Sequence, residues 1–128
     1  MKHYLLDSSF VIDLLTEMSD GEVGPAMRWS DANRAASFWV SPVTYAEVLE
    51  GAEDPVVVDR VFRAFRWQTI GRQHAGHVAR IQRRSPNKLG ENDAWQIAVA
   101  DLMGASIVGH DPRAFDRLGH RYDDYRRA

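Results

Sequence analysis

The most constraining feature of this sequence is the stretch from Leu89 to Leu102, in which a polar loop passes into a nearly continuous apolar run. Gly90 ends the loop, and Asn92 is predicted to cap a helix, because its side-chain oxygen can accept from a free backbone N–H of the first turn. Asp93 then falls in that turn, where the helix dipole favours a negative charge. The residues that follow are apolar on nearly every side, which is typical of a buried helix. We therefore expect a central helix with a carboxylate at its start.

Length and composition narrow the class of protein. A chain of 128 residues predicts a single domain, 1–128, with a substantial core. The net charge of −2 gives no overall basic field, although a local basic patch stays open. The absence of cysteine excludes disulfides, thiolate zinc sites and cysteine nucleophiles. No apolar run approaches the ~20 residues that span a bilayer, and the N-terminus lacks the apolar core of a signal peptide, so we expect a cytoplasmic protein without membrane contact.

Short apolar runs alternate with helical patterns along the chain. Buried strands are predicted at 4–6, 38–40 and 105–108. Helices are predicted to follow Ser8 or Ser9 and to cover about 25–36, 42–50, 55–65, 73–84 and 113–118. Residues 67–70 are predicted to be a connector, and the polar tail 119–128 to hold a weak edge strand or no regular structure. This alternation predicts an α/β fold, with a mainly parallel sheet in a three-layer sandwich.

Four acidic residues lie where such a fold would bring them together. Asp7 ends the first strand and Asp111 follows the strand at 105–108, so both are expected at the carboxyl edge of a parallel sheet. Asp93 starts the central helix, and Glu47 lies on an earlier helix. Four converging carboxylates cannot all stay ionised without a cation between them. Hard oxygen ligands select Mg²⁺ or Mn²⁺, and two such ions about 4 Å apart can activate water against a phosphodiester.

The sequence resembles the PIN-domain family, and within it the VapC-type toxin ribonucleases. The resemblance rests on four stretches that occur in the family's order, namely Leu5–Ser9, Ser41–Gly51, Leu89–Asp93 with Ile97 and Ala98, and Ile107–Asp111 with Phe115. Each stretch is weak alone, but the four together are quite specific. The resemblance implies an α/β/α sandwich, a metal-dependent endoribonuclease activity on RNA, frequent homodimers and a cognate antitoxin.

The resemblance also implies roles for individual residues. Asp7, Glu47, Asp93 and Asp111 match the family's acidic quartet, with Asp7 and Asp93 as the principal ligands of Mg²⁺ or Mn²⁺. Glu47 and Asp111 would complete the metal shells, directly or through water. Ser8 matches the small hydroxyl residue beside the first acid, and it would orient Asp7 by a hydrogen bond.

Two departures from the family pattern leave alternatives open. The family often has threonine two residues before the last acid, where this chain has Gly109, which leaves a direct role for Asp111 in doubt. The last strand is usually apolar, whereas the segment 120–125 is polar, which puts dimer geometry in doubt. A non-catalytic PIN scaffold that binds RNA or a protein therefore remains an alternative. A phospho-acceptor receiver domain is a weaker one, because Asp54 precedes a helix-starting proline and neither lysine follows an apolar strand.

A basic segment leads into the central helix. Arg80, Arg83, Arg84 and Lys88 are candidates for contact with RNA phosphates, and an ordinary solvated helix face is the equal alternative. Two divalent ions would add +4 to a chain of −2, so the metal-loaded form would be net positive.

Other ionisable residues are expected to lie outside the site. Asp13 is predicted to be a surface residue, Asp101 to lie too far along the central helix, and Asp116 to be a weaker candidate ligand than Asp111. Among the histidines, His74 and His77 are helix neighbours with no third convergent partner, so a zinc site is not expected.

Overall fold

The structure is a computed structural model and describes residues 1–127. The elements in these residues are β1 (His3–Leu6), α1 (Ser8–Asp20), α2 (Pro25–Ala32), β2 (Ser37–Val40), α3 (Pro42–Glu50), α4 (Pro55–Phe62), β3 (Arg66–Trp67), α5 (Arg72–Arg84), α6 (Glu91–Met103), β4 (Ser106–Gly109), α7 (Pro112–Phe115), the 3-10 helix η1 (Asp116–Arg121) and β5 (Tyr122–Asp124). Four helices begin at a proline, because the first turn needs no N–H donor there and the fixed φ of proline suits it.

The strands form one five-stranded sheet in the order β3-β2-β1-β4-β5. Every strand pair in it is parallel. This confirms the predicted α/β sandwich with a parallel central sheet. The order also argues against a receiver domain, because receivers have the strand order 2-1-3-4-5.

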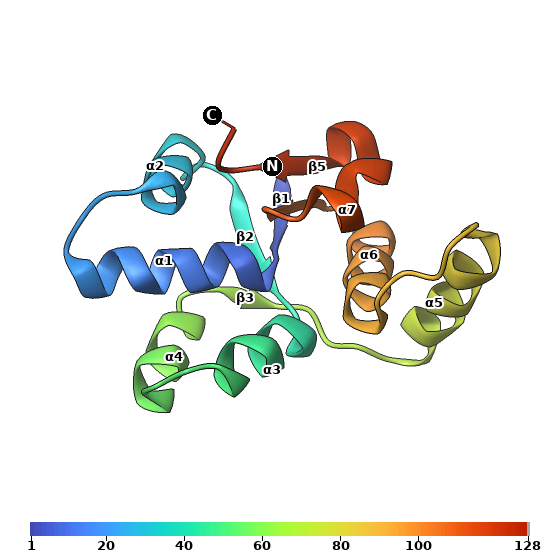
Figure 1. The fold of residues 1–128 in the computed structure, drawn as a ribbon, viewed down its shortest axis with the longest axis horizontal. Helices are drawn as coiled ribbons and strands as arrows, with labels where there is room; N and C mark the ends of the chain where they lie inside the picture. The colour runs from blue at the N-terminus through green and yellow to red at the C-terminus, as the bar shows by residue number, and fades with distance from the viewer. Residues whose placement is uncertain (128) are drawn as a thin grey trace.

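Strand β1 divides the core into two layers. Its alternating side chains send Tyr4 and Leu6 into one cluster and Leu5 into the other. The first cluster packs beneath α1, α2, α3 and α4, and the second beneath α6 and α7. Figure 1 shows α1, α2 and α4 on one side of the strands and α5 and α6 on the other. The residues of α6 from Ala94 to Ala100 are buried except for the half-buried Trp95, as predicted for a central helix, whereas Leu102 is exposed.

The structure differs from the sequence prediction in several short segments. Residues 66–67 form β3, although a connector was expected from 67 to 70, whereas the tail forms β5, the edge strand that was one of its two predicted outcomes. Helix α2 ends at Ala32 rather than near 36, because the chain turns there to enter β2 at Ser37. No helix within residues 1–127 combines the length and the apolar character needed to cross a bilayer.

The carboxyl ends of β1 and β4 meet at one edge of the sheet. The backbone N–H of Asp7 donates to the carbonyl oxygen of Val108 at 2.8 Å, one residue beyond the β1 ladder. Asp7 therefore lies beside the loop that leaves β4 and carries Asp111.

Candidate metal centre

Asp7 lies between β1 and α1 and caps the helix. Its Oδ2 accepts from the Ser9 hydroxyl at 2.9 Å and from the Ser9 backbone N–H at 3.4 Å. The residue is only 6% exposed. Burial raises the pKa of this carboxyl above its usual value, although hydrogen bonds from Ser9, Ser8 and Gln96 oppose the change. A buried carboxylate of this kind gains strongly from a nearby cation.

A network of buried polar side chains lies next to Asp7. Gln96 on α6 donates from Nε2 to the Thr44 hydroxyl at 2.6 Å, and its Oε1 accepts from the Ser41 hydroxyl at 2.7 Å. The Thr44 hydroxyl in turn donates to the carbonyl oxygen of Leu6 at 2.9 Å. The network therefore joins α6, α3 and β1 under the carboxylates. Sequence reasoning missed it, although a glutamine within the apolar run 94–100 was a signal of a buried partner.

Glu47 is half-buried on α3. Burial raises the pKa of its carboxyl, and the negative charge of Asp7 raises it further. Hydrogen bonds from Asn92 and Ser8 act in the opposite direction. The hydroxyl predicted for Asp7 is thus supplied by Ser9, whereas Ser8 serves Glu47. Ser9 takes this role because it is the second residue of the helix that Asp7 caps, which places its N–H and hydroxyl against the cap.

Asp93 lies in the first turn of α6 and is coupled to all three other acids. Its pKa rises to about 6, because of burial first and then the charges of Asp111, Asp7 and Glu47. The four predicted carboxylates therefore share one electrostatic site. Asn92 was predicted as the helix cap, and this was wrong. The helix begins earlier, at Glu91 with Gly90 as its cap, which frees the Asn92 side chain for Glu47.

Asp111 caps the short helix α7, where its Oδ1 accepts from the Ala114 N–H at 3.3 Å. Gly109 ends β4 in close contact with Asp7, since a Cβ added there would lie 2.9 Å from the Asp7 Cβ. A threonine therefore does not fit at 109 without movement. The Ser9 hydroxyl links Asp7 to the loop that follows β4, because it also accepts from the His110 backbone N–H at 3.0 Å.

The chemistry of the four carboxylates fits a hard divalent cation. None of them forms an ion pair with a basic side chain within residues 1–127. In the same part of the chain, no three acidic or histidine side chains lie close enough to enclose a metal as they stand. Mg²⁺ is usually held by one or two carboxylates and keeps several waters, so an open cluster suits it.

The predicted RNA contacts lie on and just after α5. Arg80, Arg83, Arg84 and Lys88 are all exposed. Arg80 contacts the His77 ring, with 3.3 Å between its Nη2 and Nδ1. A further basic residue joins this region, because Arg117 donates from Nη1 to the Ser85 hydroxyl at 2.9 Å.

The other acids have partners of their own. Asp101 pairs with His77 at 2.7 Å and with Arg121 at 2.6 Å, and Asp116 lies 3.9 Å from Arg127. Asp13, predicted to be a surface residue, is half-buried on α1, and its carboxylate accepts from the Tyr125 hydroxyl and from Arg126.

Comparisons with known proteins agree with this fold. The chain is similar over nearly its whole length to a toxin–antitoxin complex from Klebsiella pneumoniae, with a TM-score of 0.77 at 19% identity, covering 95% of this chain and 97% of that one. VapBC-1 from nontypeable Haemophilus influenzae has a TM-score of 0.72 at 20% identity, covering 96% of this chain and 98% of that one. DNA-bound VapBC from Salmonella typhimurium has a TM-score of 0.75 at 19% identity, covering 98% of this chain and 99% of that one. No curated protein matches the sequence. The family model of the PIN domain matches residues 4–121, and the chain belongs to that family.

Proposed function

We propose that this chain is a cytoplasmic, metal-dependent endoribonuclease and the VapC-type toxin of a toxin–antitoxin pair. The observation that carries the proposal is the coupling of Asp93 to three other carboxylates that come from different segments of the chain. A structural role does not require four mutually repelling acids at one sheet edge. The similarity to toxin–antitoxin structures supports the same activity class.

The residues divide the chemistry among themselves. Asp7 and Asp93 would be the principal ligands of Mg²⁺ or Mn²⁺, and Glu47 and Asp111 would complete the shells directly or through water. A bound pair of cations would supply an activated water and stabilise the leaving oxygen of the phosphodiester. The Ser9 hydroxyl holds the Asp7 carboxylate in place, and Ser8 and Asn92 favour the ionised form of Glu47.

RNA is the substrate that the charge distribution supports. Loading with two divalent ions would change the net charge from −2 to +2. We propose that the exposed Arg80, Arg83, Arg84 and Lys88 then contact phosphates that flank the cleaved bond.

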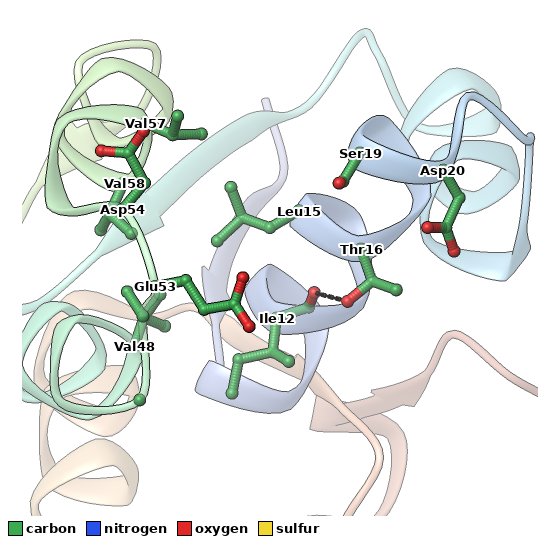
Figure 2. Close-up of a pocket in the computed structure, with 12 residues that line it drawn as sticks. Ile12, Leu15, Thr16, Ser19, Asp20, Val48, Glu53, Asp54, Val57 and Val58 are labelled. Carbon is green, nitrogen blue, oxygen red and sulfur yellow. Dashed lines mark hydrogen bonds between the residues drawn. The ribbon is translucent and has the colours of Figure 1, made fainter.

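The proposed antitoxin partner has a suitable surface in a groove between α1 and the α3–α4 connection. The groove has a volume of about 550 Å³ and contains exposed apolar side chains, with Ile12 at 46% and Val57 at 38% exposure. Figure 2 shows Ile12 on α1 and Val57 on α4, on opposite walls of the groove. Asp20, Glu53 and Asp54 also line it. It therefore fits an apolar antitoxin segment that carries basic residues. We also propose that the toxin forms homodimers, as its family often does.

Mn²⁺ titration by calorimetry and RNA cleavage, run on the same preparations, test the proposal. Asp93→Asn should lose both metal binding and cleavage with its fold intact. The matched control is Asp54→Asn, because Asp54 caps α4 outside the carboxylate site and asparagine caps helices equally well. Metal binding that survives Asp93→Asn would contradict the quartet. Metal binding without any RNA cleavage would favour the non-catalytic scaffold.

A further inference from the structure

We propose that a small aromatic pocket between α3, α4 and β3 binds one unstacked base of single-stranded RNA. The inference rests on the proposed ribonuclease function and adds a base-recognition site to it. The pocket has a volume of about 300 Å³ and is lined by Tyr45, Asp59, Phe62, Arg63 and Trp67. It is separate from the carboxylate site, because no residue that lines it belongs to the quartet.

The aromatic side chains form a fixed platform. The Tyr45 ring lies 5.2 Å from that of Phe62 and 5.3 Å from that of Trp67, measured between centroids. The indole N–H of Trp67 donates to the Phe62 carbonyl oxygen at 3.2 Å, which fixes the ring, yet the residue is 42% exposed. A rigid, exposed aromatic face is what single-strand binding proteins use to stack bases.

Polar groups around the platform suit a nucleotide. The Tyr45 hydroxyl donates to Asp59 Oδ1 at 2.6 Å and holds the carboxylate at the pocket. Within residues 1–127, the other carboxylate oxygen has no hydrogen bond or ion pair, so it can accept from an exocyclic amino group. Adenine, cytosine and guanine carry that group, and uracil does not. Arg63 on the rim and Arg60 one turn earlier are exposed and offer positive charge for phosphate.

The position of the pocket suits an RNA strand that is bound at the carboxylate site and extends beyond it. Tyr45 lies on the same helix as Glu47, and β3 ends at the same edge of the parallel sheet as β1 and β4. Two of the five residues that line the pocket, Asp59 and Arg63, are charged, whereas the core of a subunit interface is depleted of charged residues. The pocket therefore favours a nucleotide over a second copy of the chain.

Anisotropy measurements with labelled RNA test this pocket directly. Oligoadenylate and oligouridylate of about eight nucleotides, a typical single-strand site size, are titrated with the full chain in EDTA, where divalent cations are absent and no cleavage is expected. Trp67→Leu should weaken oligoadenylate binding by about 5- to 150-fold, the effect of one stacked base, and Trp67→Phe should retain most of the affinity. Asp59→Asn should reduce the ratio of the affinity for oligoadenylate to the affinity for oligouridylate. Val56→Ala, an exposed change on α4 outside the pocket, should change nothing.

Each contrary result has a distinct meaning. Unchanged RNA affinity in Trp67→Leu would overturn the base pocket, and so would the absence of RNA binding by the unmodified chain both in EDTA and with Mn²⁺. A change in assembly state of that variant in sedimentation would assign the pocket to contact between copies and also overturn it. A chain that binds RNA through Trp67 but cuts none with Mn²⁺ would keep the pocket and refute the nuclease. If Trp67→Leu cuts RNA as well as the unmodified chain does, the nuclease function would stand and the base pocket would be overturned.

Discussion

At the scale of single residues, the hydroxyl of Ser9 connects two parts of the carboxylate site. It donates to Asp7 and accepts from the backbone N–H of His110, the neighbour of Asp111. Ser9→Ala removes both hydrogen bonds while leaving the metal ligands in place. We expect Mn²⁺ binding to weaken by about 10- to 100-fold, because groups behind metal ligands fix their orientation. Calorimetry measures this change.

Ser19→Ala provides the control, since Ser19 is an exposed serine near the other end of α1. Normal metal affinity in Ser9→Ala would show that burial and the backbone N–H groups of Ser8 and Ser9 orient Asp7 without the hydroxyl. The sequence prediction chose Ser8 because that residue matches the family's small hydroxyl residue beside the first acid, although Ser9 is chemically just as suitable. Deciding between them required knowing that Asp7 itself caps α1, which places the second residue of the helix against its carboxylate.

At the scale of the element, the first turn of α6 holds a carboxylate whose charge the surroundings oppose. The helix dipole favours ionised Asp93, yet burial and three other acids raise its pKa from 3.8 to about 6. The folded state therefore keeps the proton at pH values where the unfolded chain has lost it. The stability from this group is full below pH 3.8 and is lost as the pH rises through about 6.

We therefore expect the metal-free protein to lose unfolding free energy between about pH 4 and 7. Asp93→Asn should flatten that slope, and Mn²⁺ should restore stability to the unmodified chain at neutral pH. Urea unfolding across this range measures both effects. Equal slopes for the two proteins would show that neither burial nor the other three carboxylates raise the pKa of Asp93.

The elements that sequence patterns missed, as with β3, or left open, as with β5, are those held by distant partners. The central helix and the strands β1, β2 and β4 were predicted because their own apolar residues report burial. Strand β3 has two exposed residues, and only pairing with β2 makes it a strand. Strand β5 is polar because its acids are used in contacts. Asp124 is buried against His110 at 3.0 Å, and Asp123 accepts from the Trp29 indole N–H at 3.0 Å.

At the scale of the whole molecule, the end of the chain closes over its beginning. Tyr125 is almost fully buried, and its ring packs edge-on against Phe10 at 5.1 Å between centroids. Its hydroxyl donates to the carbonyl oxygen of Ser9 at 3.1 Å and to the carboxylate of Asp13. Asp13 and Tyr125 are 112 residues apart, so no local pattern in the sequence indicates the contact. The same tail therefore contacts the first turn of α1, which donates hydrogen bonds to Asp7.

Tyr125→Phe tests how much this closure contributes to stability. The change keeps the ring but removes the hydroxyl from a carbonyl oxygen and a carboxylate, which is expected to cost about 1–3 kcal/mol of unfolding free energy. Urea denaturation measures the loss, with Tyr4→Phe as the control. Tyr4 is also buried, but its hydroxyl makes no hydrogen bond within residues 1–127, so its removal should cost less. If both variants were as stable as the unmodified chain, apolar packing on Phe10 and the Arg126–Asp13 ion pair would hold the tail without the hydroxyl.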